Sequence, residues 1–176
     1  MKNRVLADHI WTLGICLVLF VQCKQEKKFT GHKTVREYTT AQIKFDTLTY
    51  QEKVYVPTYS EIYHNAEDQY FPLLTSLSIR NTSLTENMYV NAVDYYDTEG
   101  KQLKKYLEKS IVLRPLQSVE FPVTHNDKGG AGANFIVTWG CAANMIPVIQ
   151  AVMIGSAYQQ GISFVTEGVV IEKKGL

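Results

Sequence analysis

The sequence predicts an all-β protein built as a single antiparallel sandwich, preceded by an export segment and a polar tether. From about residue 51 onward, Tyr, Val, Thr and Ile dominate the chain, and these residues favour strands. Apolar and polar residues alternate with a period of two, as in strands with one buried face. Turn residues recur at the short intervals typical of a sandwich. A closed barrel is the alternative architecture.

The first 23 residues have the layout of a bacterial export signal. Lys2 and Arg4 precede an apolar run that extends from Ile10 to Val21 and stops just before Cys23. This run is shorter than the roughly 20 residues that a membrane-spanning helix needs, and it has the length of a signal-peptide core. We therefore predict a signal peptide over residues 1–22 and lipid attachment at Cys23. Cleavage without lipid and an uncleaved anchor are the alternatives.

The remaining chain divides into a linker and one domain. Residues 23–50 contain scattered apolar residues and are predicted to be the lipid-bearing cysteine and a polar linker, with a possible edge strand at 41–45. Residues 51–176 are predicted to form the sandwich domain, since a segment of roughly this size supports one hydrophobic core. The predicted localisation is the cell envelope, with the domain facing the periplasm or the cell surface.

The expected strands follow from alternation between turn signals. The segment 88–96 is a strand closed by the turn 97–100, and its alternation would place Tyr89, Val93 and Tyr95 on one face. The segment 103–111 is the best helical candidate, and it is a weak one. The other expected strands are 73–80, a return strand starting at 104, 119–123, 135–139, 148–155 and 162–171.

Charge and cysteine usage exclude several classes of function. The chain has 18 basic and 17 acidic side chains, and removing residues 1–22 leaves 16 of each. This balance gives no electrostatic basis for binding nucleic acid. After processing, Cys141 is the remaining thiol, so a disulfide framework is not expected. Its apolar and small neighbours indicate a buried cysteine that packs as a small hydrophobe.

Motifs for catalysis are missing from the sequence. The sequence has no Gly-x-Ser-x-Gly nucleophile elbow, and no serine or threonine has a potential general base nearby at a recognised spacing. An enzymatic role is therefore not favoured, and no cofactor is predicted. The alternative is a metal-binding protein or metal-dependent enzyme that uses His64, His125 and Asp127, because imidazole and carboxylate groups are suitable metal ligands. Their spacing matches no recognised ligand pattern, which favours two surface histidines instead.

Two loops and one tyrosine-rich segment are the candidate binding regions. The glycine-rich loop after His125 lacks the Lys-Ser/Thr ending of a phosphate-binding loop, so its glycines are expected to permit positive φ or close backbone approach. A ligand-touching role for this loop stays open. Exposed tyrosines elsewhere would suit a partner protein or a glycan, although core packing is the favoured role for most of them. The candidate residues are Asp127, Lys128, Gly129, Gly130, Gly132, Tyr158, Gln159, Gln160, Tyr59, Tyr63 and His64.

Several stretches taken together resemble the bacterial domain of unknown function 3124 family. They are residues 54–63, 77–82, 93–100, 129–135, 153–155 and 159–164. The family is similar to exported and lipid-anchored bacterial proteins, and the resemblance implies no particular activity. The segment from Leu77 to Val123 also looks like the Ig-like modules of bacterial surface proteins, which implies an Ig-like sandwich and a binding role.

The expected function is therefore a non-enzymatic interaction module, held to a membrane through a lipid anchor. Its partner would be an envelope protein or a glycan.

Overall fold

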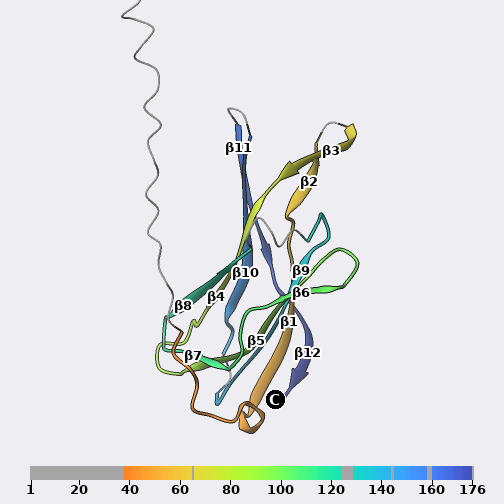
Figure 1. Cartoon of the computed structure of the whole chain (residues 1–176). Coiled ribbons are helices and arrows are strands. Elements are labelled where there is room, and N and C mark those ends of the chain that lie inside the picture. The colour runs from red at the N-terminus through yellow and green to blue at the C-terminus, as the bar shows by residue number, and fades with distance from the viewer. Residues whose placement is uncertain (1–37, 65, 124–128, 144, 158–159, 176) are drawn as a thin grey trace, which may run out of the picture. The chain divides into compact units, whose positions relative to one another are not determined.

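The computed structural model describes residues 38–64, 66–123, 129–143, 145–157 and 160–175 (Figure 1). These residues form antiparallel strands and one 3₁₀ turn, η1 (Phe45–Thr47). The strands are β1 (Tyr50–Pro57), β2 (Glu61–His64), β3 (Ala66–Pro72), β4 (Leu74–Arg80), β5 (Met88–Tyr96), β6 (Gln102–Lys105), β7 (Ile111–Leu113), β8 (Ser118–Pro122), β9 (Asn134–Cys141), β10 (Val148–Ala157), β11 (Gln160–Glu167) and β12 (Val169–Lys174).

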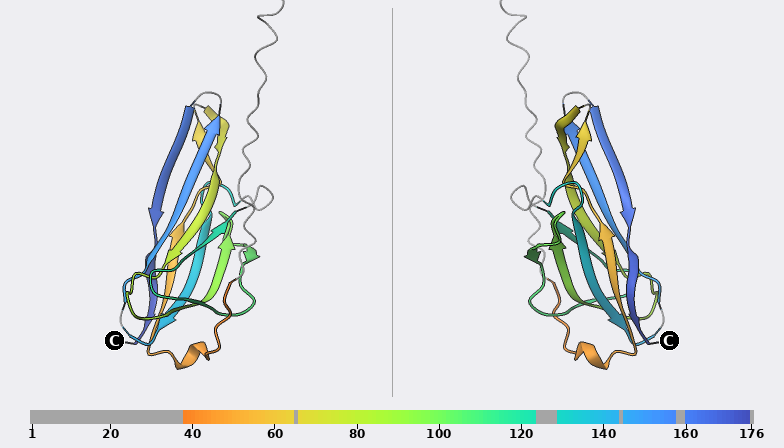
Figure 2. Two further views of the ribbon diagram at one scale, coloured as in Figure 1. Left: turned by 90° about the vertical axis from the view of Figure 1, so that its left-hand side faces the viewer. Right: turned by 90° about the vertical axis from the view of Figure 1, so that its right-hand side faces the viewer.

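The strands form two main sheets, which pack face to face as a sandwich (Figure 2). One sheet has the order β12-β1-β9-β5-β6, with β7 also paired to β5, and the other has the order β11-β10-β4-β8. The hairpin β2–β3 links β1 to β4, and Figure 1 shows it at the same end of the domain as the hairpin β10–β11. The chain also passes from one sheet to the other between β11 and β12.

The core lies between the two sheets and is built mainly from alternate residues of β1, β4, β5, β8, β9 and β10. In β4, Leu77 and Ile79 are fully buried, and in β9 the buried set is Phe135, Val137 and Trp139. Because successive strand residues point to opposite faces, these strands supply about every second side chain to the core. The predicted all-β antiparallel sandwich is therefore confirmed.

One predicted strand is divided in two. The segment 162–171 was expected to be continuous, but it is split into β11 and β12 at Gly168. A Cβ atom at Gly168 would lie 2.5 Å from Cγ1 of Val54 and 3.1 Å from the carbonyl oxygen of Ile149. Only glycine lets the backbone pass this close to both sheets as it crosses from one to the other.

The predicted alternation in residues 88–96 is wrong at its first position. A register shift between Val90 and Ala92 places one extra residue in β5 opposite β9. This bulge reverses the alternation, so Met88 and Val90 point inward before it, and Val93 and Tyr95 point inward after it. Tyr89 consequently lies on the outer face and does not share a face with Tyr95.

The two weaker sequence expectations also fail. Segment 41–45 is not a strand: Thr40 forms an isolated bridge with Ile111, and η1 follows. Segment 103–111 is not a helix, since β6 ends and β7 begins within it. Among the residues that the structure describes, no helix is long and apolar enough to span a membrane.

Candidate functional site

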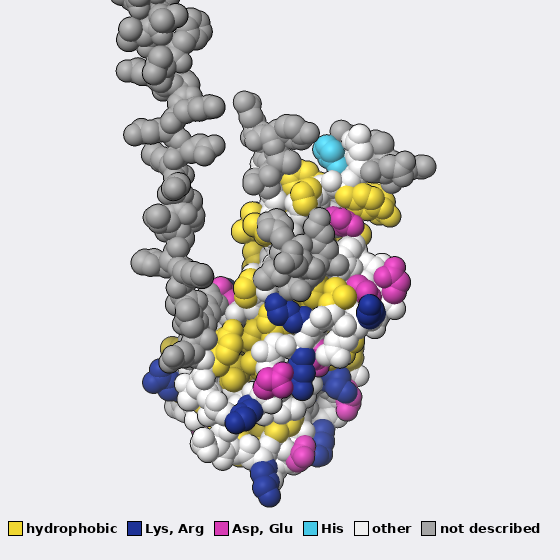
Figure 3. Space-filling view, viewed as in Figure 1, with side chains coloured by type: hydrophobic (Ala, Val, Ile, Leu, Met, Phe, Trp, Pro, Cys, Tyr) yellow, Lys and Arg dark blue, Asp and Glu magenta, His cyan; other side chains and the backbone are white. Residues whose placement is uncertain are grey.

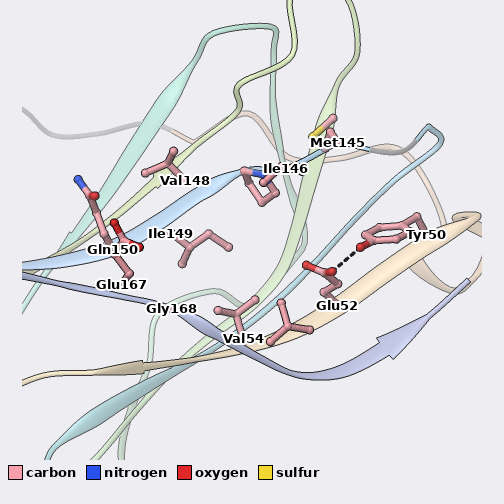
Figure 4. A pocket seen from close by; sticks show the side chains of 12 residues that line it. Tyr50, Glu52, Val54, Met145, Ile146, Val148, Ile149, Gln150, Glu167 and Gly168 are labelled. Atoms are coloured by element: carbon pink, nitrogen blue, oxygen red, sulfur yellow. Dashed lines mark hydrogen bonds between the residues drawn. The ribbon is translucent and has the colours of Figure 1, made fainter. Parts of the chain in front are cut away.

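A groove of about 400 Å³ opens between the sheets at the side where β11 gives way to β12 (Figure 4). Tyr50, Glu52 and Val54 of β1 form one wall, together with Val170 of β12. The opposite wall comes from the start of β10 and from the segment 145–147 that leads into it. Glu167 and Gly168 lie where the chain crosses between the sheets.

Glu52 occupies a core-facing position in β1. Tyr50, Val54 and Val56 are buried on the same face, and Glu52 lies in register opposite Trp139 of β9, which is fully buried. Alternation would place an apolar residue here. Burying an unpaired carboxylate is costly, so this position calls for a polar partner.

Tyr50 supplies that partner. Its hydroxyl group donates a hydrogen bond to Oε1 of Glu52, drawn as the dashed line in Figure 4. Burial and the Glu52 carboxylate raise the pKa of Tyr50 from its ordinary 10.0 to about 12. Both effects act in the same direction because they disfavour the phenolate. The hydroxyl group therefore remains a donor across the neutral range and fixes the carboxylate at the groove wall.

The groove combines apolar walls with an excess of carboxylates. Val54, Ile149 and Val170 are apolar, whereas Glu52 and Glu167 are acidic, and none of the lining residues is Lys or Arg. Lys173 lies opposite Glu52 in β12 and places its Nζ atom 4.9 Å from the centroid of the Tyr50 ring. The Lys173 ammonium group thus occupies one face of the Tyr50 ring in a cation–π contact.

The glycine-rich loop lies apart from this groove, and its described glycines are explained by packing. Gly130 has a φ of 85°, which is the conformation that glycine adopts most readily. Its N–H donates to Oγ of Ser60 at 2.8 Å, and the carbonyl oxygen of Gly129 accepts a hydrogen bond from Oγ1 of Thr98 at 2.9 Å. A Cβ atom at Gly129 would lie 2.5 Å from the Tyr95 hydroxyl oxygen. Gly132 donates its N–H to Thr98 Oγ1. These hydrogen bonds connect the loop to the turn after β5 and to the residue before β2.

The tyrosine-rich candidates lie on the β2–β3 hairpin and just before it. Tyr59 packs edge-on against Phe164 of β11, with ring centroids 5.9 Å apart. Tyr63 is 67% exposed and stacks on Tyr70 across the hairpin, and His64 lies beside Phe71. Figure 3 shows hydrophobic side chains exposed at this end of the molecule. Most other tyrosines are at least partly buried.

Several candidates lie outside the described residues. These are Cys23, His125, Asp127, Lys128, Tyr158 and Gln159. Gln160 begins β11. None of the described candidates lines the groove. The sequence-based search missed Tyr50 and Glu52, although a signal was present, since Glu52 interrupts the apolar positions 50, 54 and 56 of one strand face.

Metal ligands and the lone thiol give no second site among the described residues. No group of three His, Cys, Asp or Glu side chains that could hold a metal ion occurs in this part of the chain. Cys141 is fully buried, as expected for a cysteine that packs as a small hydrophobe. Burial also raises the pKa of its thiol, which disfavours the reactive thiolate.

The fold and the groove together define an antiparallel β-sandwich protein with an acidic, apolar-walled groove at one open side. The family model described as "Protein of unknown function (DUF3124)" matches residues 51–171, and the chain belongs to this family. No curated protein matches the chain. The crystal structure of Thermotoga maritima 1070 is similar with a TM-score of 0.39 and 14% identity, over 67% of this chain and 92% of that chain.

Proposed function

We propose that this chain is a non-enzymatic binding module, held at a membrane of the cell envelope by lipid on Cys23, and that the groove beside β1 and β12 receives its ligand. The observation that supports a binding role is Glu52, a carboxylate at a core-facing position, oriented by Tyr50 and open to the groove. An apolar residue at this position would stabilise the sandwich better. A ligand that uses the carboxylate accounts for its presence.

The groove chemistry suggests the class of ligand. Apolar walls favour an apolar body, and two carboxylates without a lining Lys or Arg favour a positively charged group on it. An alkyl chain that carries an ammonium group has both features. A lysine or arginine side chain of an envelope protein presents the same chemistry.

The tether is supported by the order of features at the start of the chain. A basic tip, a short apolar run and a cysteine precede a polar stretch, the arrangement typical of an export signal. Basic and acidic side chains are interspersed on the face shown in Figure 3. The nearly neutral charge of the chain also fits a module that does not bind nucleic acid.

Trp139 provides a built-in probe for the groove. It lies opposite Glu52 and packs against Tyr50, with ring centroids 5.6 Å apart. Trp11 lies in the predicted signal peptide, so Trp139 is the tryptophan of the processed chain. We expect decylamine to change its fluorescence in a saturable manner and sodium decanoate, of equal chain length, to bind more weakly. Glu52→Gln should lower the affinity for decylamine about tenfold, the effect of losing one charge-assisted contact.

Glu172→Gln is the matched control, because this carboxylate pairs with Lys53 on the outer face of the same sheet. It should leave decylamine binding unchanged. The proposed site would be contradicted if decylamine and decanoate bind equally well. It would also be contradicted if decylamine binds the native chain and Glu52→Gln with equal affinity. The tether is tested separately by the intact mass of the protein from its native host. Residues 23–176 plus acyl chains, with no acyl chains on Cys23→Ser, are expected, and an unmodified Cys23 would contradict the anchor.

A further inference from the structure

Most of the outer edges of the two sheets carry features that prevent further strand pairing. β12 has a register shift against β1 and ends in Lys173 and Lys174. β8 contains Glu120 and Pro122, and β6 is four residues long and ends in two lysines. β7 is already covered, since Thr40 bridges Ile111. Bulges, edge lysines, prolines and short strands are the usual protections of exposed edges.

β11 has none of these protections. It pairs with β10 over eight consecutive residues without a register shift. Residues 161–166 contain no charged residue and no proline. Its other side pairs with no strand in the described part of the chain. A long, regular edge whose only charge is at its last residue, Glu167, is a site for strand addition.

The strand is also held in place for such pairing. Phe164 packs against Tyr59, and Oγ1 of Thr166 donates a hydrogen bond to the carbonyl oxygen of Pro57 in the opposite sheet. These contacts fix the inner side of β11 to the sandwich. An edge that is already ordered loses little conformational entropy when another strand joins it.

We propose that β11 is a self-association edge, at which a second copy of this chain adds its own β11 in antiparallel orientation about a two-fold axis. The two four-stranded sheets would then form one continuous sheet across the dimer. A two-fold contact requires a surface that is complementary to itself. The sequence of β11 meets this requirement.

The pairing register shows why the edge is self-complementary. With the axis at Phe164, Ser163 lies opposite the partner's Val165, and Ile162 lies opposite its Thr166. The acidic Glu167 then lies opposite Gly161, so no like charges face each other. Directly opposed like charges would destabilise the pair.

The outer face of the same sheet next to this edge is also apolar and exposed. Val165 and Ile154 are each 52% exposed, and Leu74 is 55% exposed. Cross-strand register places Val165 beside Val152, and Ile154 beside both Ser163 and Leu74. A second copy would continue these uncharged rows. The second copy would therefore lie beside Val165 at the edge and would leave Ile154 and Leu74, on the strands behind it, outside the contact.

The experiment is sedimentation velocity of the full chain in mild detergent over a wide range of concentration. We expect a reversible monomer–dimer equilibrium. The double variant Ser163→Lys/Val165→Lys places two lysine pairs directly opposite each other in the dimer and should raise the dimer dissociation constant about tenfold or more. Thermal unfolding of the variant monomer verifies that it is folded.

Val152→Lys/Ile154→Lys is the matched control, because these residues lie in the same two cross-strand rows, one strand further from the edge. It should leave most of the dimer intact. In addition, amide hydrogen exchange in β11 should slow as the concentration rises. A native chain that stays monomeric, an edge variant that dimerises normally, or dimers broken only by the control variant would each overturn the proposal. The last result would indicate docking through the sheet face instead. The double variant Ser163→Cys/Val165→Cys should cross-link to a second copy, and cross-linking to a different protein would also overturn the proposal.

Discussion

The hydroxyl group of Tyr50 donates a hydrogen bond to the carboxylate of Glu52, two residues further along the same strand. Both side chains point into the space between the sheets, at the side where Lys173 of β12 lies over the Tyr50 ring. The two side chains thus lie on the face of β1 whose other residues pack in the core. This arrangement gives the groove its acidic group and connects the groove to the stability of the sandwich.

The Tyr50–Glu52 pair should make stability depend on alkaline pH. The folded-state pKa of Tyr50 is about 12, above its ordinary value of 10.0. A raised pKa stabilises the fold fully below pH 10, and this contribution is lost as the pH rises through 12. Tyr50→Phe should therefore reduce the loss of stability in this interval, measured by urea unfolding at a series of pH values. At neutral pH the variant should lose about 1–2 kcal/mol with the hydrogen bond.

Tyr55→Phe is the control for this measurement, because Tyr55 lies on the opposite face of the same strand. It should leave the dependence on alkaline pH in place. If Tyr50→Phe and the native chain lose the same stability between pH 10 and 12, the Tyr50 hydroxyl group is not held by Glu52 as described.

Gly130 should be required for folding and not for ligand binding in the groove. Its φ of 85° is unfavourable for other residues, and a Cβ atom there would lie 2.6 Å from Oγ1 of Thr98. Gly130→Ala should therefore cost about 1–3 kcal/mol in unfolding free energy. Gly161→Ala is the control, since its Cβ atom would meet only the Gly155 carbonyl oxygen at 3.9 Å. If Gly130→Ala has normal stability, or if its folded fraction does not bind decylamine, the loop contributes to ligand binding and not only to folding.

The strands that the sequence predicted well are those with one buried and one exposed face. β5 has the predicted bounds, Met88–Tyr96, and β4 and β9 lie close to theirs. In these strands, burial imposes the period of two that alternation detects. The prediction failed where a long-range contact determines the backbone. The break at Gly168 depends on Val54 and Ile149, and the bulge in β5 depends on its pairing with β9.

The groove could not be predicted in the same way because its walls are far apart in the sequence. β1 and the start of β10 face each other only after the chain has crossed between the sheets. Glu52 could have been noticed as a charge within an apolar strand face, but Glu167 has no local pattern that marks it. The glycine and tyrosine candidates were predicted because these residue types are unusually frequent in their segments. Backbone conformation and close packing account for the described glycines, and ring contacts in and beside the β2–β3 hairpin account for the described tyrosines.

Tyr95 and Tyr63 should differ in how much each contributes to the free energy of unfolding. Tyr95 is fully buried against Phe135, with ring centroids 4.8 Å apart, whereas Tyr63 is 67% exposed. Tyr95→Ala should cost about 3–5 kcal/mol in unfolding free energy, since it leaves a large cavity. Tyr63→Ala should change this quantity by about 0.5 kcal/mol or less. Chemical unfolding measures both, and comparable losses would show that the β2–β3 hairpin contributes to the cooperative core.

The thiol of Cys141 should be unreactive in the folded chain. The side chain is fully buried, and burial raises the pKa of its thiol. Alkylation by iodoacetamide requires an accessible thiolate, so labelling should be slow at neutral pH and become fast on unfolding in urea. The measurement is mass spectrometry of residues 23–176 carrying Cys23→Ser, which leaves Cys141 as the one thiol.

The control moves the thiol by one residue, from the buried position 141 to the exposed position 142. The double variant Cys141→Ala/Ala142→Cys should react rapidly while folded, because its thiol is in solvent and free of the desolvation that burial imposes. Labelling of the native thiol at the rate of this control would mean that the end of β9 opens readily. Since Cys141 pairs with both Tyr50 and Met88 across the sheet, such opening would also release the Tyr50 end of the groove, and the affinity for decylamine would then depend on the same local unfolding.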